Sequence, residues 1–257
     1  MIAPRGSAQS VVAALTVSEC TLSARGVLIP RAEPHLVARF GPTAAHGLDL
    51  HVIGARQRAR RKNVLRGQRV VMARLRLGLH EAVLGLPSSA IVDRVVPLDE
   101  LWGPAAARLA EQLAEAKDLS TAAALLESAI AARLADTAQR VHTNLALDAC
   151  AQLATRRVGE VADALGVSTR NLRRVFRDVV GMSPKEYARL ARFHHALREA
   201  RRSGGELDWA GLAAAAGYYD QAHMIAEFRD IAGVTPRALL SELGFGGQPG
   251  ARAALNW

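Results

Sequence analysis

Two stretches near the C-terminal end of the chain decide the fold of that region: FRDVVGMSP at residues 176–184 and FRDIAGVTP at residues 228–236. Phe, Arg, Asp, Gly and Pro fall at identical spacings in both, at an offset of 52 residues. Upstream, VADALG at 161–166 matches LAAAAG at 212–217 at an offset of 51 residues, so the second copy has one extra residue in its turn. Five identities in nine matched positions indicate an internal repeat, in which one supersecondary unit is used twice.

The first copy has the pattern of two short helices joined by a tight turn. A helix over VGEVADAL is predicted to end at Gly166, because glycine readily adopts the left-handed conformation at a helix terminus. Ser168 is a good N-cap for the next helix. The apolar stripe of that helix has the spacing of a core-facing side and consists of Leu172, Val175, Phe176 and Val179.

The arginines of the same helix form a second stripe, displaced from the first by two residues: Arg170, Arg173, Arg174 and Arg177. Two residues correspond to about 200° around a helix, so the arginines lie opposite the core. A helix-turn-helix with an outward basic face is typical of major-groove readers, in which arginine pairs with guanine. The alternative is an ordinary solvated face. The absence of an acid among the four arginines, together with the turn and the repeat, favours DNA contact.

These residues resemble the AraC/XylS family of transcriptional regulators. The resemblance covers about residues 145–243 and rests on VADALGVSTRNLRRVFRDVVGMSPKEYARLARFHHAL and LAAAAGYYDQAHMIAEFRDIAGVTPRAL. It implies two helix-turn-helix subdomains joined by a long helix, which would begin at Pro184 after the cap Ser183 and end at about Arg202. It also implies that Arg170, Arg173 and Arg174 sit where family members reach bases or phosphates.

The repeat predicts that the two units are not equivalent. The positions that match the four arginines are Ala222, Ile225, Ala226 and Arg229, and family members commonly keep an arginine where this chain has Ala226. The formal charge is +7 over residues 155–202 and −3 over residues 203–257. We therefore expect the first unit to dominate DNA binding. The predicted DNA-binding residues are Ser168, Thr169, Arg170, Arg173, Arg174, Arg177, Gln221 and Ile225.

The N-terminal part has the patterns of strands. VMARLRL at 71–77 alternates Val71, Ala73, Leu75 and Leu77 with two arginines, and strands are also predicted at 26–30, 35–40 and 48–52. Residues through about 103 are similar to the cupin-like sensor regions of some family members, and helical patterns begin at Leu101. The predicted fold is α+β: a β-rich cupin-like sensor domain (1–100), a helical connector (101–148) and an all-α double helix-turn-helix domain (149–245).

Composition narrows the function classes. The net charge of +9 favours polyanionic partners such as nucleic acid or an anionic membrane surface. No apolar run is long enough to span a membrane, and the N-terminus is too polar for a signal peptide. Cys20 and Cys150 have no CxxC partner, so two reduced thiols in a cytoplasmic protein are expected. The basic run RQRARRK at 56–62 is interpreted as a solvated loop or charged edge strand, with a nucleic-acid or acidic-ligand patch as the alternative.

The expected function is therefore a sequence-specific transcriptional regulator that binds double-stranded DNA. No catalytic arrangement, cofactor or metal site is expected. A small-molecule effector, RNA polymerase and a homodimer partner are left open as further partners. The alternative function is a protein–protein adaptor with degenerate DNA-binding units; loss of the arginine face would have favoured it, and that face is intact in the first unit.

Overall fold

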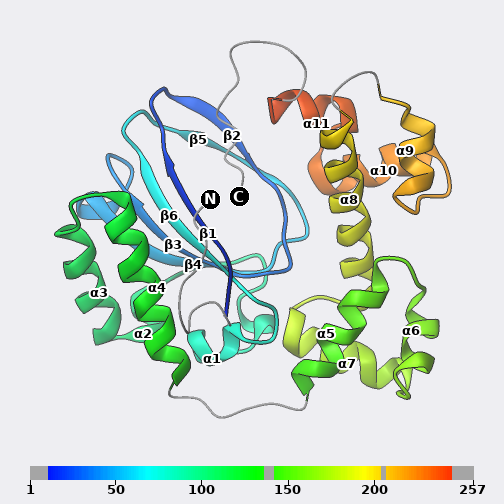
Figure 1. Cartoon of the computed structure of the whole chain (residues 1–257), viewed down its shortest axis with the longest axis horizontal. Helices are drawn as coiled ribbons and strands as arrows, with labels where there is room; N and C mark the ends of the chain where they lie inside the picture. The colour runs from blue at the N-terminus through cyan, green and yellow to red at the C-terminus, as the bar shows by residue number, and fades with distance from the viewer. Residues whose placement is uncertain (1–10, 136–141, 204–206, 245–257) are drawn as a thin grey trace.

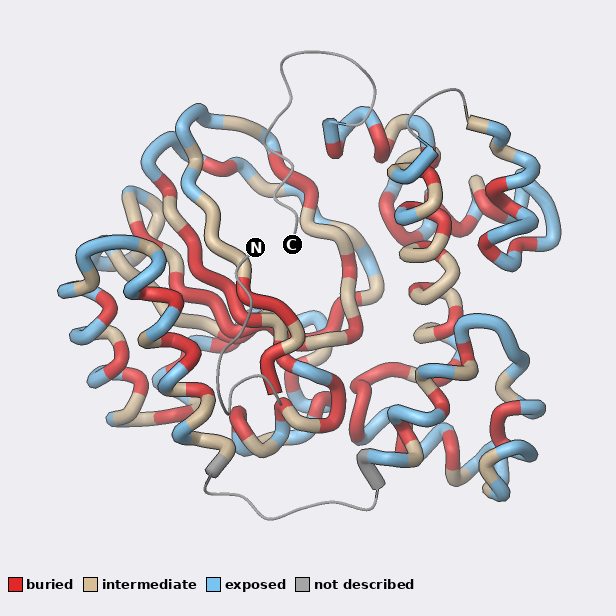
Figure 2. Tube along the Cα trace, viewed as in Figure 1, coloured by how far each residue is buried: buried red, intermediate tan, exposed pale blue. Residues whose placement is uncertain are grey.

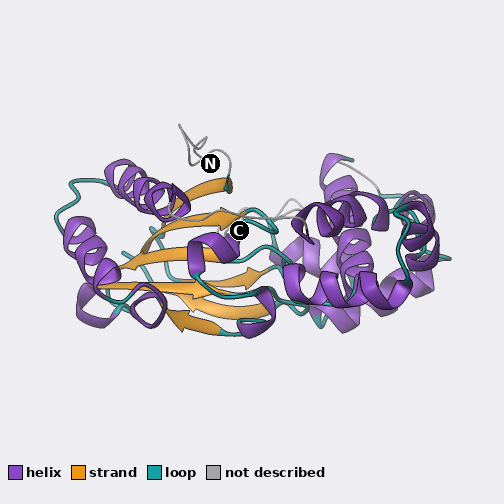
Figure 3. Ribbon diagram, turned by 90° about the horizontal axis from the view of Figure 1, so that it is seen from below, coloured by secondary structure: helices purple, strands orange, loops and turns teal. Residues whose placement is uncertain are grey.

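A computed structural model describes residues 11–135, 142–203 and 207–244 of the 257-residue chain. An antiparallel sheet occupies the N-terminal part and helices occupy the C-terminal part, side by side (Figure 1). In a second view the strands lie between the helices of the N-terminal part and those of the C-terminal part (Figure 3). The predicted α+β class, with a β-rich N-terminal region followed by an all-helical C-terminal region, is confirmed.

The main sheet has five strands in the order β1-β6-β3-β4-β7, and every neighbouring pair is antiparallel. These strands are β1 (Val12–Glu19), β3 (His35–Phe40), β4 (Leu48–Ile53), β6 (Arg69–Leu75) and β7 (Val95–Pro97). Strands β2 (Ala24–Leu28) and β5 (Arg60–Val64) form a separate antiparallel pair. The sequence patterns located β3 and β4, placed β2 two residues too late, and missed β1 and β7; they left β5 open between a loop and a charged edge strand.

The alternation predicted for residues 71–77 gives β6 two different faces. Val71, Ala73 and Leu75 belong to the core beneath the helices of the N-terminal part. Val70 and Met72 point the other way and form a small apolar cluster with Val37 of β3. The second face is therefore also shielded from water, so β6 is buried on both sides, which the arginines at 74 and 76 did not suggest.

Helices close the first face of the sheet. They are α1 (His80–Leu84), α2 (Leu98–Trp102), α3 (Pro104–Ala114) and α4 (Leu119–Ala135). Two 3₁₀ turns complete this part: η2 (Ala45–Gly47) between β3 and β4, and η3 (Ser88–Ala90) between α1 and β7. Helix α4 crosses β1 and β6 and buries Leu126 and Ile130 against them. The buried segments run through the sheet and the inner sides of these helices (Figure 2).

The C-terminal helices share one hydrophobic core, and a few residues of the N-terminal part pack into it. They are α5 (His142–Leu153), α6 (Val158–Ala164), α7 (Thr169–Val180), α8 (Pro184–Arg202), α9 (Trp209–Ala215), α10 (Gln221–Ala232) and α11 (Pro236–Glu242). Phe176, Phe193 and Phe228 are its largest fully buried side chains, and the same cluster includes Val27 and Ala55 of the N-terminal part. Within the described residues, no helix has the length and apolarity to cross a membrane.

Candidate nucleic-acid interface

The first unit has the predicted helix-turn-helix. Helix α6 ends before Gly166, whose φ of +65° is the left-handed conformation that favours glycine at this point. Ser168 caps α7, because its Oγ accepts a hydrogen bond of 3.2 Å from the backbone N–H of Asn171. Its hydroxyl proton is still available to a phosphate oxygen. The predicted stripe, Leu172, Val175, Phe176 and Val179, is buried.

All four arginines of the predicted stripe are exposed on the outer side of α7. Arg174 is held locally: its guanidinium donates to Asn171 Oδ1 at 2.9 Å and lies 3.8 Å from the carboxylate of Asp178. Thr169, at the start of α7, is also exposed. The helix therefore presents its N-terminal turn and a nearly continuous cationic row to solvent, which is the geometry needed to enter a groove.

Asn171 is a residue that the sequence patterns did not single out. It lies in the first turn of α7 and orients Arg174 through its side-chain oxygen. Its amide is also one of the two side chains that pair bidentately with adenine. An asparagine inside the arginine row was the available signal.

The second unit repeats the scaffold with a different surface. Asp220 caps α10 by accepting a 2.7 Å hydrogen bond from the N–H of His223. Met224, Phe228 and Ile231 bury the stripe that packs the unit. Gln221 is exposed and Ile225 is half-buried.

Tyr219 was missed by the sequence patterns. It precedes the cap of α10 and its side chain is 92% exposed. A phenol at this turn is able to donate to a phosphate. The signal was an aromatic residue in the turn between two predicted helices.

The joining helix α8 spans the two units with the predicted bounds, and its basic residues bind the second unit. Ser183 and Glu186 form a reciprocal capping box at its start. Arg189 and Arg192 donate to the buried carboxylate of Glu227 at 3.1 and 2.9 Å. Part of the positive charge counted for the first unit is thus paired with acids of the second unit. The difference in unpaired surface charge between the two units is therefore smaller than the difference counted from the sequence.

The N-terminal part contacts the two units at equivalent places. In the first unit, Ser88 Oγ donates to the carbonyl of Val179 at 3.1 Å. In the second unit, the N–H of Ala59 donates to the carbonyl of Ile231 at 2.8 Å. Val179 and Ile231 are 52 residues apart and occupy the same position of the repeat. Both carbonyls belong to the last turn of a recognition helix, where carbonyls lack partners within the helix.

The basic run at 56–62 supplies much of the second contact. Arg58 pairs with Asp230 at 2.9 Å, and Arg61 donates to Glu242 at 3.0 Å and to the carbonyl of Ala232 at 3.0 Å. Part of the run forms β5, as the edge-strand interpretation predicted. Arg58 and Arg61 pair with helices α10 and α11, so this part of the run is a contact between the two parts of the chain. Arg56 and Lys62 of the same run line a cavity instead.

Comparisons with known proteins fall on the same region. A helix-turn-helix domain family matches residues 161–242. No curated protein matches the chain. Among solved structures, ToxT from Vibrio cholerae O395 is 10% identical with a TM-score of 0.45, covering 88% of this chain and 95% of that chain. Unsaturated fatty acid-bound wild-type ToxT from Vibrio cholerae strain SCE256 is 8% identical with a TM-score of 0.44, covering 88% of this chain and 94% of that chain.

Proposed function

We propose that the chain is a DNA-binding transcription regulator of the AraC type, and that its first helix-turn-helix unit reads the major groove through the arginine face of α7. The match of residues 161–242 to a helix-turn-helix domain family supports this role. The observation that carries this proposal is the exposure of all four arginines on one side of a capped helix. Arg170 and Arg173 lie toward the N-terminal end of α7 and read bases. Arg174 and Arg177 lean toward phosphates, together with Ser168 and Thr169.

Salt dependence tests this proposal. If the protein neutralises roughly 4 to 6 phosphates, log Kd against log salt should have a slope of about 4 to 5 in magnitude per protomer on a selected duplex. Arg173→Ala with Arg174→Ala should weaken binding and flatten the slope. Arg25→Ala with Arg108→Ala removes the same charge from exposed positions of the N-terminal part and serves as the control. A slope near zero, or equal losses in both pairs, would contradict the proposal.

The second unit keeps the adaptor alternative open for its own surface. Ala222, Ile225 and Ala226 replace three of the four arginines, and these small or apolar side chains suit a protein partner such as RNA polymerase. Gln221 remains able to contact a base edge, and Ile225 a thymine methyl group. We propose a minor DNA contact here, with a partner contact as the alternative.

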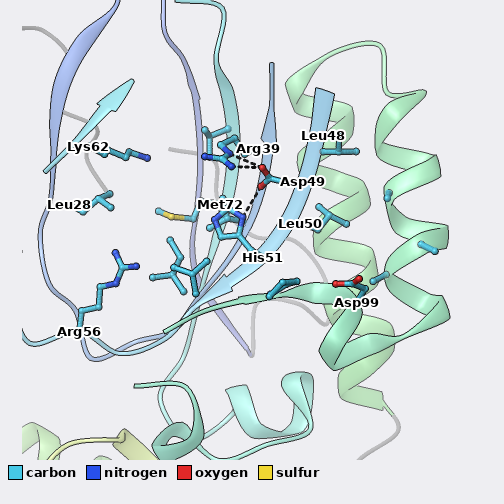
Figure 4. Close-up of a pocket in the computed structure, with 18 residues that line it drawn as sticks. Leu28, Arg39, Leu48, Asp49, Leu50, His51, Arg56, Lys62, Met72 and Asp99 are labelled. Carbon is cyan, nitrogen blue, oxygen red and sulfur yellow. Dashed lines mark hydrogen bonds and ion pairs between the residues drawn. The ribbon is translucent and has the colours of Figure 1, made fainter. Parts of the chain in front are cut away.

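We further propose that the N-terminal part senses a small-molecule effector. A cavity of about 750 Å³ lies between the second face of the sheet and strand β5 (Figure 4). Its floor is apolar and includes Val37, Val70 and Met72. This volume is typical of small-molecule sites. Homodimerisation through this part stays a prediction.

A further inference from the structure

One end of the cavity is cationic and largely withdrawn from water. Arg56, in the loop before β5, and Lys62, on β5, both point into the cavity (Figure 4). Arg56 is only 7% exposed, and none of the described residues accepts a hydrogen bond from its Nε. Burial and the nearby cation of Arg60 lower the pKa of Arg56, and Asp93 partly offsets this. A buried guanidinium with an unused donor favours an anion.

Lys62 lies in the same cationic surroundings as Arg56. Burial, followed by the cations of Arg39 and Arg56, lowers the pKa of Lys62 to about 8. An anion placed between Arg56 and Lys62 would offset the repulsion and raise the pKa of Lys62 again.

Of the two acids that line the cavity, Asp99 lies on the side away from Arg56 and Lys62 (Figure 4), and Asp49 is already paired. On the sheet, Asp49 accepts from Arg39 Nε at 2.9 Å and lies 2.8 Å from His51 Nδ1, so these three groups satisfy one another. Their pairing lowers the pKa of Asp49 against the effect of burial. Between the two polar ends the cavity is lined by Leu28, Ile53 and the apolar floor.

We propose that the effector is an organic anion with an apolar body, whose acidic group binds Arg56 and Lys62 while its body covers Met72 and the apolar floor. This rests on the proposed sensing function and names the chemistry of the ligand. Apolar contact supplies affinity and the buried cations supply selection, because a neutral ligand of the same shape would leave Arg56 Nε without a partner.

A pair of fluorescent probes tests the proposal on the full chain. Anilinonaphthalene sulfonate and N-phenylnaphthylamine share an aromatic body, and only the first carries an anion. The wild type should bind the sulfonate at least about tenfold more tightly than the neutral amine. Arg56→Met and Lys62→Met should each remove most of that preference and leave the affinity for the amine unchanged. Arg25→Met, at an exposed position on the neighbouring strand β2, should preserve the preference.

The possible results distinguish failure of the anion proposal from failure of the proposed sensing function. Equal wild-type affinities for the two probes would overturn the anion proposal while leaving a sensing cavity. Absence of binding by either probe would overturn both. The thermal unfolding of each variant is measured alongside, and Arg56→Lys, which keeps the charge, should retain a larger part of the sulfonate preference than Arg56→Met if charge is the cause. Equal losses in Lys and Met variants of similar stability would also contradict the anion proposal.

A second inference rests on the repeat rather than on the cavity. The N-terminal part donates hydrogen bonds to the carbonyls of Val179 and Ile231, which are equivalent in the two units. It thus caps the C-terminal ends of both recognition helices, and the cation of Arg61 adds a favourable charge at the end of α10. We infer that the N-terminal part is a brace that fixes the separation and relative rotation of α7 and α10.

Spin labels on the two recognition helices measure the brace directly. Asp178→Cys and His223→Cys provide exposed attachment sites, in a background without Cys20 and Cys150. Ser88→Ala with Arg61→Ala should broaden the distribution of label distances about twofold or more, whereas Arg60→Ala, an exposed neighbour on β5, should not. An unchanged distribution in the double variant would show that α8 alone sets the arrangement and would overturn the inference.

Discussion

The arginines of α7 differ in what they can contribute, although all four are exposed. Arg170→Ala is expected to cost about 1 to 3 kcal/mol at the preferred site and to relax one base preference, because it lies in the first turn of the recognition helix. Arg177→Ala should weaken all sequences alike, because it lies two turns further on, where we propose a phosphate contact. Binding to a panel of single-base variants of the site measures both. An unchanged ranking of sites in Arg170→Ala would show that the assignment is wrong.

The two cysteines should differ sharply in reactivity. Burial raises the pKa of the Cys150 thiol to about 12, so at pH 8 only about one molecule in ten thousand carries the thiolate at this position. Both cysteines are partly buried, but the Cys20 thiol lies in an exposed turn, where it donates to the carbonyl of Leu22. Iodoacetamide is therefore expected to alkylate Cys20 long before Cys150, as followed by peptide mass spectrometry. In urea the two rates should become similar. Fast labelling of Cys150 in the folded chain would contradict the packing of its thiol against the C-terminal core.

At the scale of elements, three glycines that end helices allow the cost of backbone strain to be distinguished from the cost of disturbing the contact with the N-terminal part. Gly166, Gly181 and Gly233 all have positive φ, so alanine at each should cost about 1 kcal/mol or slightly more. A Cβ on Gly181 would lie 2.8 Å from Val92 Cγ2, whereas the corresponding contact is 3.5 Å at Gly233 and no atom lies within 4 Å at Gly166. Gly181→Ala should therefore lose about 1 to 3 kcal/mol more than the other two. Urea unfolding of the three variants measures this, and equal losses would mean that the N-terminal part yields at this contact.

Local patterns predicted the elements whose ends are marked by caps. Ser183 and Pro184 set the start of α8, Ser168 set the start of α7, and both helices begin where the sequence placed them. The sequence left strand β5 open between a loop and an edge strand, because four of its five residues are arginine, lysine or asparagine and show no alternation of apolar and polar residues. Its strand conformation is set by pairing with β2 and by the acids of α10 and α11, which are about 170 to 180 residues away. No local pattern contains that information.

In the candidate site, too, local features were predictable from the sequence and contacts between distant residues were not. The outward direction of the arginines follows from helical periodicity and was predictable. The roles of Arg189 and Arg192 were not, because their partner Glu227 lies on another helix. The cavity with Arg56 and Lys62 also depends on how β5 lies over the sheet. The sequence therefore showed a single basic run and did not distinguish its cavity-lining residues from those that contact α10 and α11.

At the scale of the whole molecule, the proposed division is into residues 1–100, 101–148 and 149–245. The helices of the connector, 101–148, do not all pack against the same part of the chain. Helices α3 and α4 pack on the sheet region, whereas α5 packs against α7 and α8. We propose that α3 and α4 move with the sensor and α5 with the DNA-binding helices. The N-terminal part then acts on DNA binding through the docked ends of α7 and α10, through further contacts with α8 and α11, and through the shared core.

This arrangement sharpens the expected inequality of the two units. The first unit has four exposed arginines on α7, and the second has Ala222, Ile225, Ala226 and Arg229 at the matching positions. The acids Glu227 and Asp230 of the second unit are occupied by Arg189, so they repel DNA less than the charge count of −3 suggests. The second unit should therefore tolerate a nearby duplex without contributing much to affinity.

Footprinting with paired variants measures the inequality. Arg173→Ala with Arg174→Ala should abolish specific protection over the whole site, because the lost contacts are charge-assisted and in the groove. Gln221→Ala with Ile225→Ala should cost about 1 kcal/mol or less, since a neutral hydrogen bond and a methyl contact are the only terms removed. Both pairs leave the buried stripes intact, so circular dichroism should be unchanged. Equal losses from the two pairs would mean that Gln221 and Ile225 contribute as much to binding as the arginines do, and that surface charge is a poor guide to which unit dominates.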